Sequence, residues 1–424
     1  MRYKSPGNLT KGQQKVFDLL NKSEDNLFVS GSAGTGKTHL IHAIRNHPNT
    51  IVVAPTGIAA LTCKGSTIHR AFQLPFGLLM NRDLGKYYNK ALEKCKLLII
   101  DEISMVRADL LDAIDQKMRT IKKTYSPFGG VRTILVGDFY QLAPVLISNE
   151  EKAFKQHYKS PFAFDSNAWK FVNFVPVILD EVKRQNENSS SILNQIRVGD
   201  YSSISIINES PIRSSLTENM TTLTTTNAKA DRVNQAFLDQ IKSPAVKFET
   251  ITEGNVLADV VPKDIVLKVG ARVLLTKNSD EYVNGDTGVV ISLPSKDDPT
   301  IRVKVDRTES TVNVEQAVWE FFKYSNVGNK VVSTVDGRAY QYPLKSGWAI
   351  TIHKSQGMSL NSFALDLSQS FAHGQIYVGL SRIIDLKNLS LTRPISKDDF
   401  ILDPAVEKFY ESLQKNAHYL KSVA

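Results

Sequence analysis

The chain contains little cysteine and no long apolar segment. Its 424 residues include two cysteines, Cys63 and Cys95, which are too few to hold a four-ligand zinc ion by themselves. We expect both thiols to be buried in a protein of a reducing compartment. No apolar run approaches the roughly 18 residues that a membrane-spanning helix needs, so we expect no membrane partner.

The first seven residues lack the apolar stretch of a secretion signal. We therefore expect the protein to act in the cytoplasm, on the nucleoid, if its source is a bacterium or a phage. If the source is a eukaryote, we expect a nuclear protein.

Acidic residues are fewer than basic ones. The chain has 43 Asp and Glu against 52 Lys and Arg, which gives a net charge of +9 and a pI near 9.2. This balance favours a polyanionic partner such as nucleic acid, although many basic proteins bind none. The length and a hydrophobic content of 42% indicate a globular protein of two or three domains.

Short apolar runs alternate with helical stretches in two zones of the chain, a pattern typical of βαβ units and parallel sheets. The runs of the first zone are Leu27–Val29, Ile51–Ala54, Leu97–Ile100, Thr133–Val136 and Val175–Leu179. Those of the second zone are Trp348–Thr351, Phe363–Leu367, Ile376–Leu380 and Leu389–Leu391. The fold class that we predict is α/β, with two parallel-sheet lobes.

The region between the two zones has a different pattern. Ile301–Val305 and Thr311–Val314 alternate apolar and polar residues, as half-buried antiparallel strands do. Asn284-Gly285 is a strong hairpin-turn signal. We predict a small β-barrel inserted at 231–344, preceded by a strand at Met220–Thr224. The predicted first lobe is then 1–155, and the second is 156–230 with 345–424.

A phosphate-binding loop follows the first predicted strand. Its eight residues are Gly31, Ser32, Ala33, Gly34, Thr35, Gly36, Lys37 and Thr38. The glycines let backbone N–H groups surround phosphate oxygens, and the following helix N-terminus adds positive potential. In this pattern Lys37 reaches the β- and γ-phosphates of ATP, and the Thr38 hydroxyl ligates Mg²⁺.

Two other strand ends carry polar residues suited to hydrolysis. Asp101 and Glu102 follow Leu97–Ile100, and we predict Asp101 in the Mg²⁺ shell and Glu102 as the group that activates water. Gln141 follows the Thr133–Val136 run and could contact the γ-phosphate. A glutamine at a strand end can equally be an ordinary loop residue.

Phosphoryl transfer also needs positive charge at the transferred group, which an arginine often supplies. Arg184 and Arg382 each follow an apolar run that we assign to a strand, in what we take to be different lobes. Exposed arginines in ordinary salt bridges are the alternative for either one.

Turns rich in threonine are candidate nucleic-acid contacts, because hydroxyl, amide and imidazole groups suit phosphate oxygens. The residues concerned are Thr56, His69, Thr226, His353 and Lys354. Helix capping and turn formation are the alternative, and composition does not separate the two.

The segment after Glu102 predicts an amphipathic helix. Its apolar face comprises Leu110, Leu111, Ile114, Met118 and Ile121, and its remaining surface carries Lys117, Arg119, Lys122 and Lys123. One interpretation is a core-packed helix with a solvated basic side. The other is an element that couples nucleotide state to the second lobe or to DNA.

Taken together, the motifs resemble those of superfamily 1 helicases, and among them the Pif branch, which moves 5′ to 3′. The motifs are Gln13, Gly31–Thr38, Ala54–Ala60, Gly65–His69, Asp101–Ser104, Gly137–Val145, Leu179–Gln185, Thr351–Gly357 and Tyr377–Arg382. The discriminating piece, here called the signature segment, is residues 105–112 with 127–130. Gly12 and Ala143 depart from the residues common in this family.

The resemblance implies two RecA-like lobes and an SH3-like barrel. It implies an adenine contact for Gln13, and γ-phosphate contacts for Gln141, Arg184 and Arg382. It also implies DNA-facing roles for Thr56, His69, Thr226, His353 and Lys354. A wedge segment that separates strands is expected at 72–94, with Phe76, Leu78 or Met80 against the last base pair.

The resemblance further implies single-stranded DNA and forked or tailed duplexes as partners, and extends to G-quadruplexes and DNA–RNA hybrids. The expected processes are DNA replication, repair, recombination and telomere maintenance, and we expect a monomer in the absence of DNA. Two rivals stay open: an ATP-switch protein whose ATPase ignores DNA, and a non-enzymatic DNA-binding module.

Overall fold

The computed structural model describes residues 3, 6–80, 84, 89–146, 148–213, 218–256, 261–327, 330–366, 368 and 372–423. The chain forms two compact units. The first comprises Met1–Lys183, Phe321–Asp336 and Leu402–Ala424, and the second comprises Arg184–Glu320 and Gly337–Ile401. Within the ranges described, no helix is both long and apolar enough to cross a membrane.

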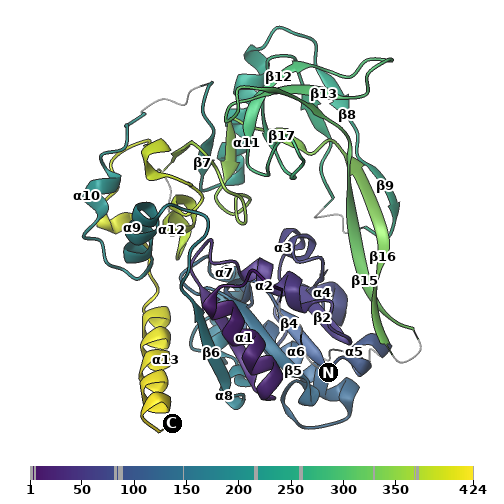
Figure 1. Cartoon of the computed structure of the whole chain (residues 1–424), viewed down its shortest axis with the longest axis vertical. Coiled ribbons are helices and arrows are strands. Elements are labelled where there is room, and N and C mark those ends of the chain that lie inside the picture. The colour runs from purple at the N-terminus through teal and green to yellow at the C-terminus, as the bar shows by residue number, and fades with distance from the viewer. Residues whose placement is uncertain are drawn as a thin grey trace. The chain divides into compact units, whose positions relative to one another are not determined.

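The first unit is built on a six-stranded sheet in the order β3-β2-β4-β5-β1-β6, and every pair of neighbours is parallel. Its strands are β1 (Asn26–Gly31), β2 (Thr50–Ala54), β3 (Ser66–Thr67), β4 (Leu97–Ile100), β5 (Arg132–Gly137) and β6 (Phe174–Leu179). All five runs predicted for the first zone are strands of this sheet. Figure 1 shows them as the central layer of the unit.

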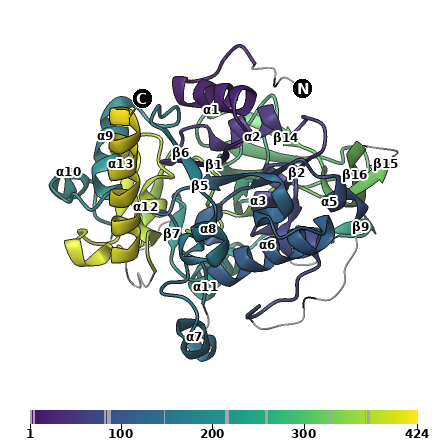
Figure 2. The same ribbon diagram turned by 90° about the horizontal axis from the view of Figure 1, so that it is seen from below.

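Helices cover both faces of this sheet, which explains why strands β2, β4 and β5 are buried along their whole length rather than at alternate residues. On one face, α1 (Lys11–Lys22) and α2 (Lys37–Ile44) share a core with Leu27 and Val29 of β1. On the other face, α6 (Ala108–Lys122) and α8 (Asn167–Phe171) share a core with Phe28. Figure 2 shows α1 and α6 on opposite sides of the strands.

Further helices and turns complete the first unit. They are α3 (Gly57–Thr62), α4 (Ile68–Phe72), α5 (Lys90–Lys94), α7 (Ser148–Lys155), α13 (Pro404–Val423) and the 3₁₀ turns η1 (Ile103–Met105), η2 (Pro127–Gly130) and η3 (Ala163–Asp165). The hairpin tip Phe321–Asp336 also belongs here. The Tyr324 hydroxyl accepts from Val52 N at 3.0 Å and donates to Val52 O at 3.2 Å, which satisfies backbone groups of β2.

This division differs from the predicted boundary at residue 155. Because β6 pairs with β1, the segment up to Lys183 belongs to the first unit. The C-terminal helix α13 belongs there too, since Val406 and Tyr410 lie in the same core as Phe28. Both segments had been predicted in the second lobe.

The second unit contains a parallel four-stranded sheet in the order β18-β7-β19-β20. Its strands are β7 (Thr222–Thr224), β18 (Ala349–Thr351), β19 (Phe363–Leu365) and β20 (Leu389–Leu391). Its helices are α9 (Glu187–Arg197), α10 (Ile204–Ile207), α11 (Asn227–Gln240) and α12 (Gln375–Leu380), with the 3₁₀ turns η4 (Leu386–Asn388) and η5 (Lys397–Asp399).

One predicted strand of the second zone is wrong: residues 375–380 form helix α12. Gly374, at φ 69°, precedes the helix, and every residue of α12 is buried. A short, fully buried apolar run has no polar alternation, so periodicity alone cannot distinguish a strand from a helix.

The region between the zones forms antiparallel sheets, as predicted, although its first residues, 231–240, belong to helix α11 rather than to a strand. Its five-stranded sheet has the order β14-β13-β12-β11-β17, with β11 (Arg272–Leu275), β12 (Thr287–Ser292), β13 (Ile301–Val305), β14 (Thr311–Val314) and β17 (Leu344–Ser346). Alternate residues of β13 are buried. Smaller sheets join β8 (Val246–Phe248) to β10 (Ile265–Leu267), and β15 (Ala317–Val327) to β16 (Lys330–Gln341) and β9 (Ile251–Gly254).

The Asn284-Gly285 pair does not make a two-residue hairpin. It lies near the end of a longer connection between β11 and β12, where Gly285 has φ 102°. A side chain at Gly285 would also collide with the Ser359 carbonyl. The glycine is therefore required both by backbone conformation and by close packing.

Candidate functional site

The predicted phosphate loop connects buried strand β1 to helix α2. The loop needs glycine at Gly34 and Gly36, whose φ angles are 86° and 81°. The Lys37 ammonium donates to the carbonyls of Gly31 at 2.6 Å and Ser32 at 3.0 Å. The loop therefore holds the Lys37 ammonium at the N-terminus of α2, where the phosphate-loop pattern places a cation beside the phosphates.

Gln13 connects this loop to helix α1. Its Oε1 accepts from the Thr10 N–H at 3.0 Å in a capping box, and its Nε2 donates to Gly36 O at 3.0 Å. A side chain at Gly36 would lie 2.6 Å from that same nitrogen. The buried carboxamide thus fixes the end of the loop through the protein itself; its predicted adenine contact stays a prediction.

Asp101 and Glu102 lie at the carboxyl end of β4. The Glu102 N–H donates to Asp101 Oδ1 at 2.9 Å, and Glu102 has φ 50° and ψ 48°, a left-handed conformation that is costly for glutamate. Burial, and next the charge of Glu102, raise the pKa of Asp101 to about 7, while the charge of Lys37 opposes this. The phosphate loop and the β4 end therefore influence each other electrostatically.

The donors present fit Mg²⁺ held jointly with a nucleotide. Among the residues that the structure describes, no group of three or more His, Cys, Asp or Glu side chains is arranged to hold a metal alone. Mg²⁺ in phosphate-transfer sites typically uses one or two protein oxygens and takes the rest from phosphates and water. Thr38 and Asp101 are hard oxygen donors of that kind.

Gln141 lies just beyond the end of β5. It is buried, and its Nε2 donates to Asp138 Oδ2 at 3.2 Å. Its backbone N–H donates to Asp138 O at 2.9 Å. Because β5 lies between β4 and β1, the first unit gathers the loop, Asp101 and Gln141 along one sheet edge, where ligands of open α/β sheets bind.

The runs that precede the two predicted arginines lie in different units, since β6 belongs to the first and residues 375–380 to the second; both arginines themselves fall in the second unit. Arg184 donates to Ser381 O and Gly357 O, each at 3.5 Å. Arg382 is 1% exposed, and donates to Val378 O at 2.9 Å, Ser381 Oγ at 2.7 Å and Ser355 O at 3.4 Å. The chain brings both guanidinium groups to the segment around Ser381.

Two of the residues predicted to face DNA, Thr56 and His69, have clear structural roles. Thr56 caps α3 by accepting from Ala59 N at 3.2 Å, as the capping alternative proposes. The His69 ring stacks on Phe76, with centroids 4.6 Å apart. Thr226 lies at the N-cap of α11, but its side chain makes no capping bond.

His353 and Lys354 follow β18 in the second unit. Burial lowers the pKa of His353, whereas Lys354 is exposed. The Lys354 N–H donates to Thr351 Oγ1 at 3.3 Å. Only Lys354 of this pair presents its side chain fully to solvent, and the DNA contacts of both stay predictions.

The structure separates the three candidate wedge residues. Leu78 and Met80 pack against the cluster of Ala108, Phe154 and Tyr158. Phe76 is 75% exposed. The remainder of the predicted wedge segment at 81–83 and 85–88 lies outside the described residues.

The predicted amphipathic helix is α6, which begins within the signature segment. On α6, Leu111, Ile114 and Met118 are buried, as predicted. The basic side is not simply solvated, however. Lys117 is buried and donates to Leu84 O, and Lys122 donates to Glu93 O at 2.5 Å and to Cys95 O at 2.7 Å.

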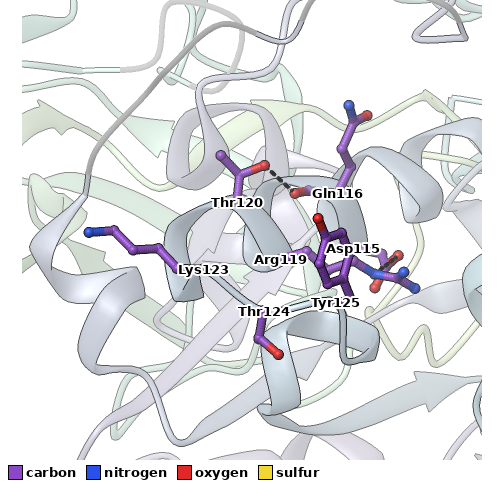
Figure 3. A pocket seen from close by; sticks show the side chains of 7 residues that line it. All are labelled: Asp115, Gln116, Arg119, Thr120, Lys123, Thr124 and Tyr125. Atoms are coloured by element: carbon purple, nitrogen blue, oxygen red, sulfur yellow. Dashed lines mark hydrogen bonds and ion pairs between the residues drawn. The ribbon is translucent and has the colours of Figure 1, made fainter.

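The η2 turn closes against the end of α6. Phe128 N donates to Asp115 Oδ1 at 2.5 Å, and the Phe128 ring is buried. Around this end of the helix lies an open hollow of about 530 Å³, shown in Figure 3. None of the predicted site residues lines it; its lining residues are Asp115, Gln116, Arg119, Thr120, Lys123, Thr124 and Tyr125.

Sequence reasoning missed Tyr410. It is buried on α13, and its hydroxyl lies 2.8 Å from Ser30 Oγ, at the start of the phosphate loop. A tyrosine in a C-terminal amphipathic helix belongs to no motif. Only the packing of α13 on the first unit reveals it.

Comparison with known proteins identifies the family. A family model described as PIF1-like helicase matches residues 8–210, and a second helicase model matches residues 312–413. The ATP-dependent DNA helicase PIF1 of Xenopus laevis is 32% identical over 92% of this chain and 62% of its own length. The chain thus spans less than two thirds of that relative.

Solved structures match over nearly full length. Bacteroides sp Pif1 in complex with ADP-AlF4 is 33% identical, with a TM-score of 0.88, over 97% of this chain and 98% of that one. Bacteroides Pif1 bound to ssDNA matches with 33% identity and a TM-score of 0.69, over the same shares of the two chains. The chain belongs to the PIF1-like helicase family.

Proposed function

We propose that the protein is an ATP-dependent DNA helicase that moves 5′ to 3′ along single-stranded DNA and unwinds duplexes. The observation that carries the proposal is the arrangement in the first unit. A phosphate loop, a carboxylate pair and a buried glutamine lie together at the ends of adjacent strands. Family membership and the ADP-AlF4 and ssDNA complexes of Bacteroides Pif1 support it.

In this proposal ATP binds to the phosphate loop, from Gly31 to Thr38, with Lys37 on the β- and γ-phosphates. Gln13 contacts the adenine while it holds the Gly36 carbonyl. Gln141, Arg184 and Arg382 contact the γ-phosphate. The family resemblance supports each of these roles.

In this proposal Asp101 and Glu102 have different roles because their surroundings differ. Glu102, beside Asp101 and in a strained backbone conformation, orients the attacking water and takes its proton. Asp101 and Thr38 would hold Mg²⁺, which would neutralise charge on the phosphates. The low polarity that raises the pKa of Asp101 also strengthens every charge interaction at this edge of the sheet.

The DNA side of the proposal uses both units. Thr56 and His69 of the first unit and Thr226, His353 and Lys354 of the second contact the phosphate backbone, so binding is largely independent of sequence and weakens with salt. We propose that each unit carries a RecA-like lobe, and that the five-stranded sheet is part of an SH3-like barrel. Phe76 of the wedge segment meets the last base pair.

The proposed partners are single-stranded DNA, forked or tailed duplexes, G-quadruplexes and DNA–RNA hybrids. One solved relative is described as showing unwinding at forked dsDNA by two coordinating Pif1 helicases. For this chain we propose a monomer in the absence of DNA. Its proposed location is the nucleoid for a bacterial or phage source and the nucleus for a eukaryotic one.

ATP hydrolysis measured with and without an oligothymidine strand tests the enzyme class. We expect strong stimulation by the strand, and at least about hundredfold loss of turnover in Lys37→Ala. Lys15→Ala, which removes an exposed lysine of α1, is the matched control and should behave as wild type. Hydrolysis that ignores DNA would instead indicate an ATP-switch protein, and DNA binding without hydrolysis a binding module.

A further inference from the structure

The hydroxyl of Tyr410, on the C-terminal helix α13, lies among three polar groups of the first unit. Ser30 Oγ is 2.8 Å away. The Phe139 N–H donates to the hydroxyl at 3.2 Å, and the hydroxyl donates to Asp138 Oδ1 at 3.3 Å. Since a phenol has one proton and Asp138 receives it, Ser30 is the donor in the remaining bond.

These three groups belong to the two strand ends that frame the nucleotide site. Ser30 directly precedes Gly31, the first residue of the phosphate loop. Asp138 directly follows β5 and accepts from Gln141 Nε2 at 3.2 Å. In the sheet, Ser30 of β1 lies opposite Gly137 of β5. The Tyr410 hydroxyl therefore ties the phosphate loop to the loop that holds Gln141.

Aromatic packing fixes the position of this hydroxyl. The Tyr410 ring stacks on Tyr140, with centroids 4.5 Å apart and planes 12° apart. The preceding residue, Phe409, stacks on Phe164, with ring centroids 4.5 Å apart and ring planes 9° apart. Stacked aromatic pairs stabilise the fold beyond the effect of buried area alone. They therefore hold α13 in the position where the Tyr410 hydroxyl reaches Ser30 and Asp138.

We propose that Tyr410 is a positioning residue for ATP hydrolysis, which makes the C-terminal helix part of the catalytic lobe. The proposal rests on the ATPase function proposed above. The contacts of the Tyr410 hydroxyl are with protein groups, Ser30, the Phe139 N–H and Asp138. Tyr410 acts through Asp138 and Ser30, by holding Gln141 and the phosphate loop in one geometry.

The test variant is Tyr410→Phe, which keeps the ring and its stacking but removes the hydroxyl. Phe139 N and Ser30 then lose a partner, and the Gln141 loop is less well positioned. We expect kcat for DNA-stimulated hydrolysis to fall about tenfold, since small misplacements of catalytic groups have effects of that order or larger. The KM for ATP should change less than about twofold, because the Lys37 contacts remain.

Tyr158→Phe is the matched control. Tyr158 and Tyr410 are both 8% exposed. Like Tyr410, Tyr158 donates its hydroxyl proton to a carboxylate, Asp112 Oδ2, at 2.8 Å. Asp112 receives further bonds from Asn167 and Ala168, which the predicted nucleotide site does not include. We expect the control to lower the melting temperature as Tyr410→Phe does, and to leave kcat unchanged.

A second readout separates positioning from folding. Affinity for ADP with aluminium fluoride, which mimics the transferred phosphoryl group, should fall about tenfold in Tyr410→Phe, while affinity for ADP alone stays within about twofold. Equal kcat in Tyr410→Phe and wild type would overturn the proposal, as would equal losses in both variants. A wild-type protein without DNA-stimulated hydrolysis would instead overturn the proposed function.

Discussion

Arg107 and Asp109 form a two-pronged ion pair at the start of α6, with Nε to Oδ1 at 2.8 Å and a terminal nitrogen to Oδ2 at 2.7 Å. Each also holds the wedge segment. Arg107 donates to Gly77 O at 2.7 Å, and Asp109 Oδ2 accepts from Leu79 N at 2.9 Å. The signature segment thus fixes the backbone on either side of Leu78, while the Phe76 ring, stacked on His69, is 75% exposed.

Replacing Phe76 by alanine should reduce unwinding more than hydrolysis. The ring is exposed and rests on His69, so its loss removes a stacking surface for a base without disturbing the core. We expect base pairs opened per ATP to fall severalfold, measured by parallel unwinding and ATPase assays. Phe171→Ala is the control, because Phe171 is 74% exposed. An unchanged ratio in Phe76→Ala would contradict the wedge role.

Replacing Gln13 by alanine should weaken ATP binding. The change removes the bond to Gly36 O and half of the capping box, each worth about 1 kcal/mol, so the loop loses its fixed end. We expect the KM for ATP to rise about fivefold or more, measured by steady-state hydrolysis. The neighbouring Gln14 is exposed, and Gln14→Ala should leave KM unchanged. Equal KM values in both variants would exclude this role.

Gly129 is the glycine of the signature segment that the fold cannot replace. Its φ is 65°, and a Cβ there would lie 2.6 Å from the Met118 carbonyl oxygen. Gly129→Ala should therefore lower the free energy of unfolding by more than about 2 kcal/mol, measured with urea.

Gly130→Ala is the control for this effect. Gly130 also has a positive φ, 71°, but the nearest atom to its added Cβ is Ser126 Cβ at 3.8 Å. It should show only the conformational cost of about 1 kcal/mol. A smaller loss at Gly129 than at Gly130 would show that α6 and η2 do not pack as described.

His69 should make stability depend on pH. Burial, and next the charge of Arg107, lower the pKa of His69 from its usual 6.5. The unfolded chain therefore takes up a proton at higher pH than the folded chain does. The stability that the neutral ring contributes is present above pH 6.5 and is lost as the pH falls towards the folded pKa.

His69→Gln removes this titration, so its unfolding free energy should fall less between pH 7 and pH 5 than that of wild type. Urea unfolding at several pH values measures the difference. Identical slopes in His69→Gln and wild type would show that the ring is not shielded as the structure indicates.

The parallel sheet of the first unit could be predicted because its strands β2, β4 and β5 are buried along their whole length. Leu97–Ile100 and Ile134–Val136 are unbroken apolar runs, and this signal depends only on local sequence. The phosphate loop could be predicted for a similar reason, since its glycines and Lys37 are adjacent in the chain.

What could not be predicted depends on contacts distant in sequence. Nothing near Tyr410 in the chain indicates Ser30, and nothing near Lys117 indicates that the Leu84 carbonyl covers it. The boundary after β6 likewise follows from its pairing with β1 rather than from composition. The strand predicted at Ile376–Leu380 was wrong because a short, fully buried apolar run has the same sequence pattern whether it forms a helix or a strand.

Unwinding of two matched duplexes, one with a 5′ and one with a 3′ single-stranded tail, tests the central claim most directly. We expect ATP-dependent opening of the 5′-tailed duplex, little opening of the 3′-tailed one, and neither with Lys37→Ala. Preference for the 3′ tail would contradict the proposed direction of movement, and opening by Lys37→Ala would contradict the role of the phosphate loop.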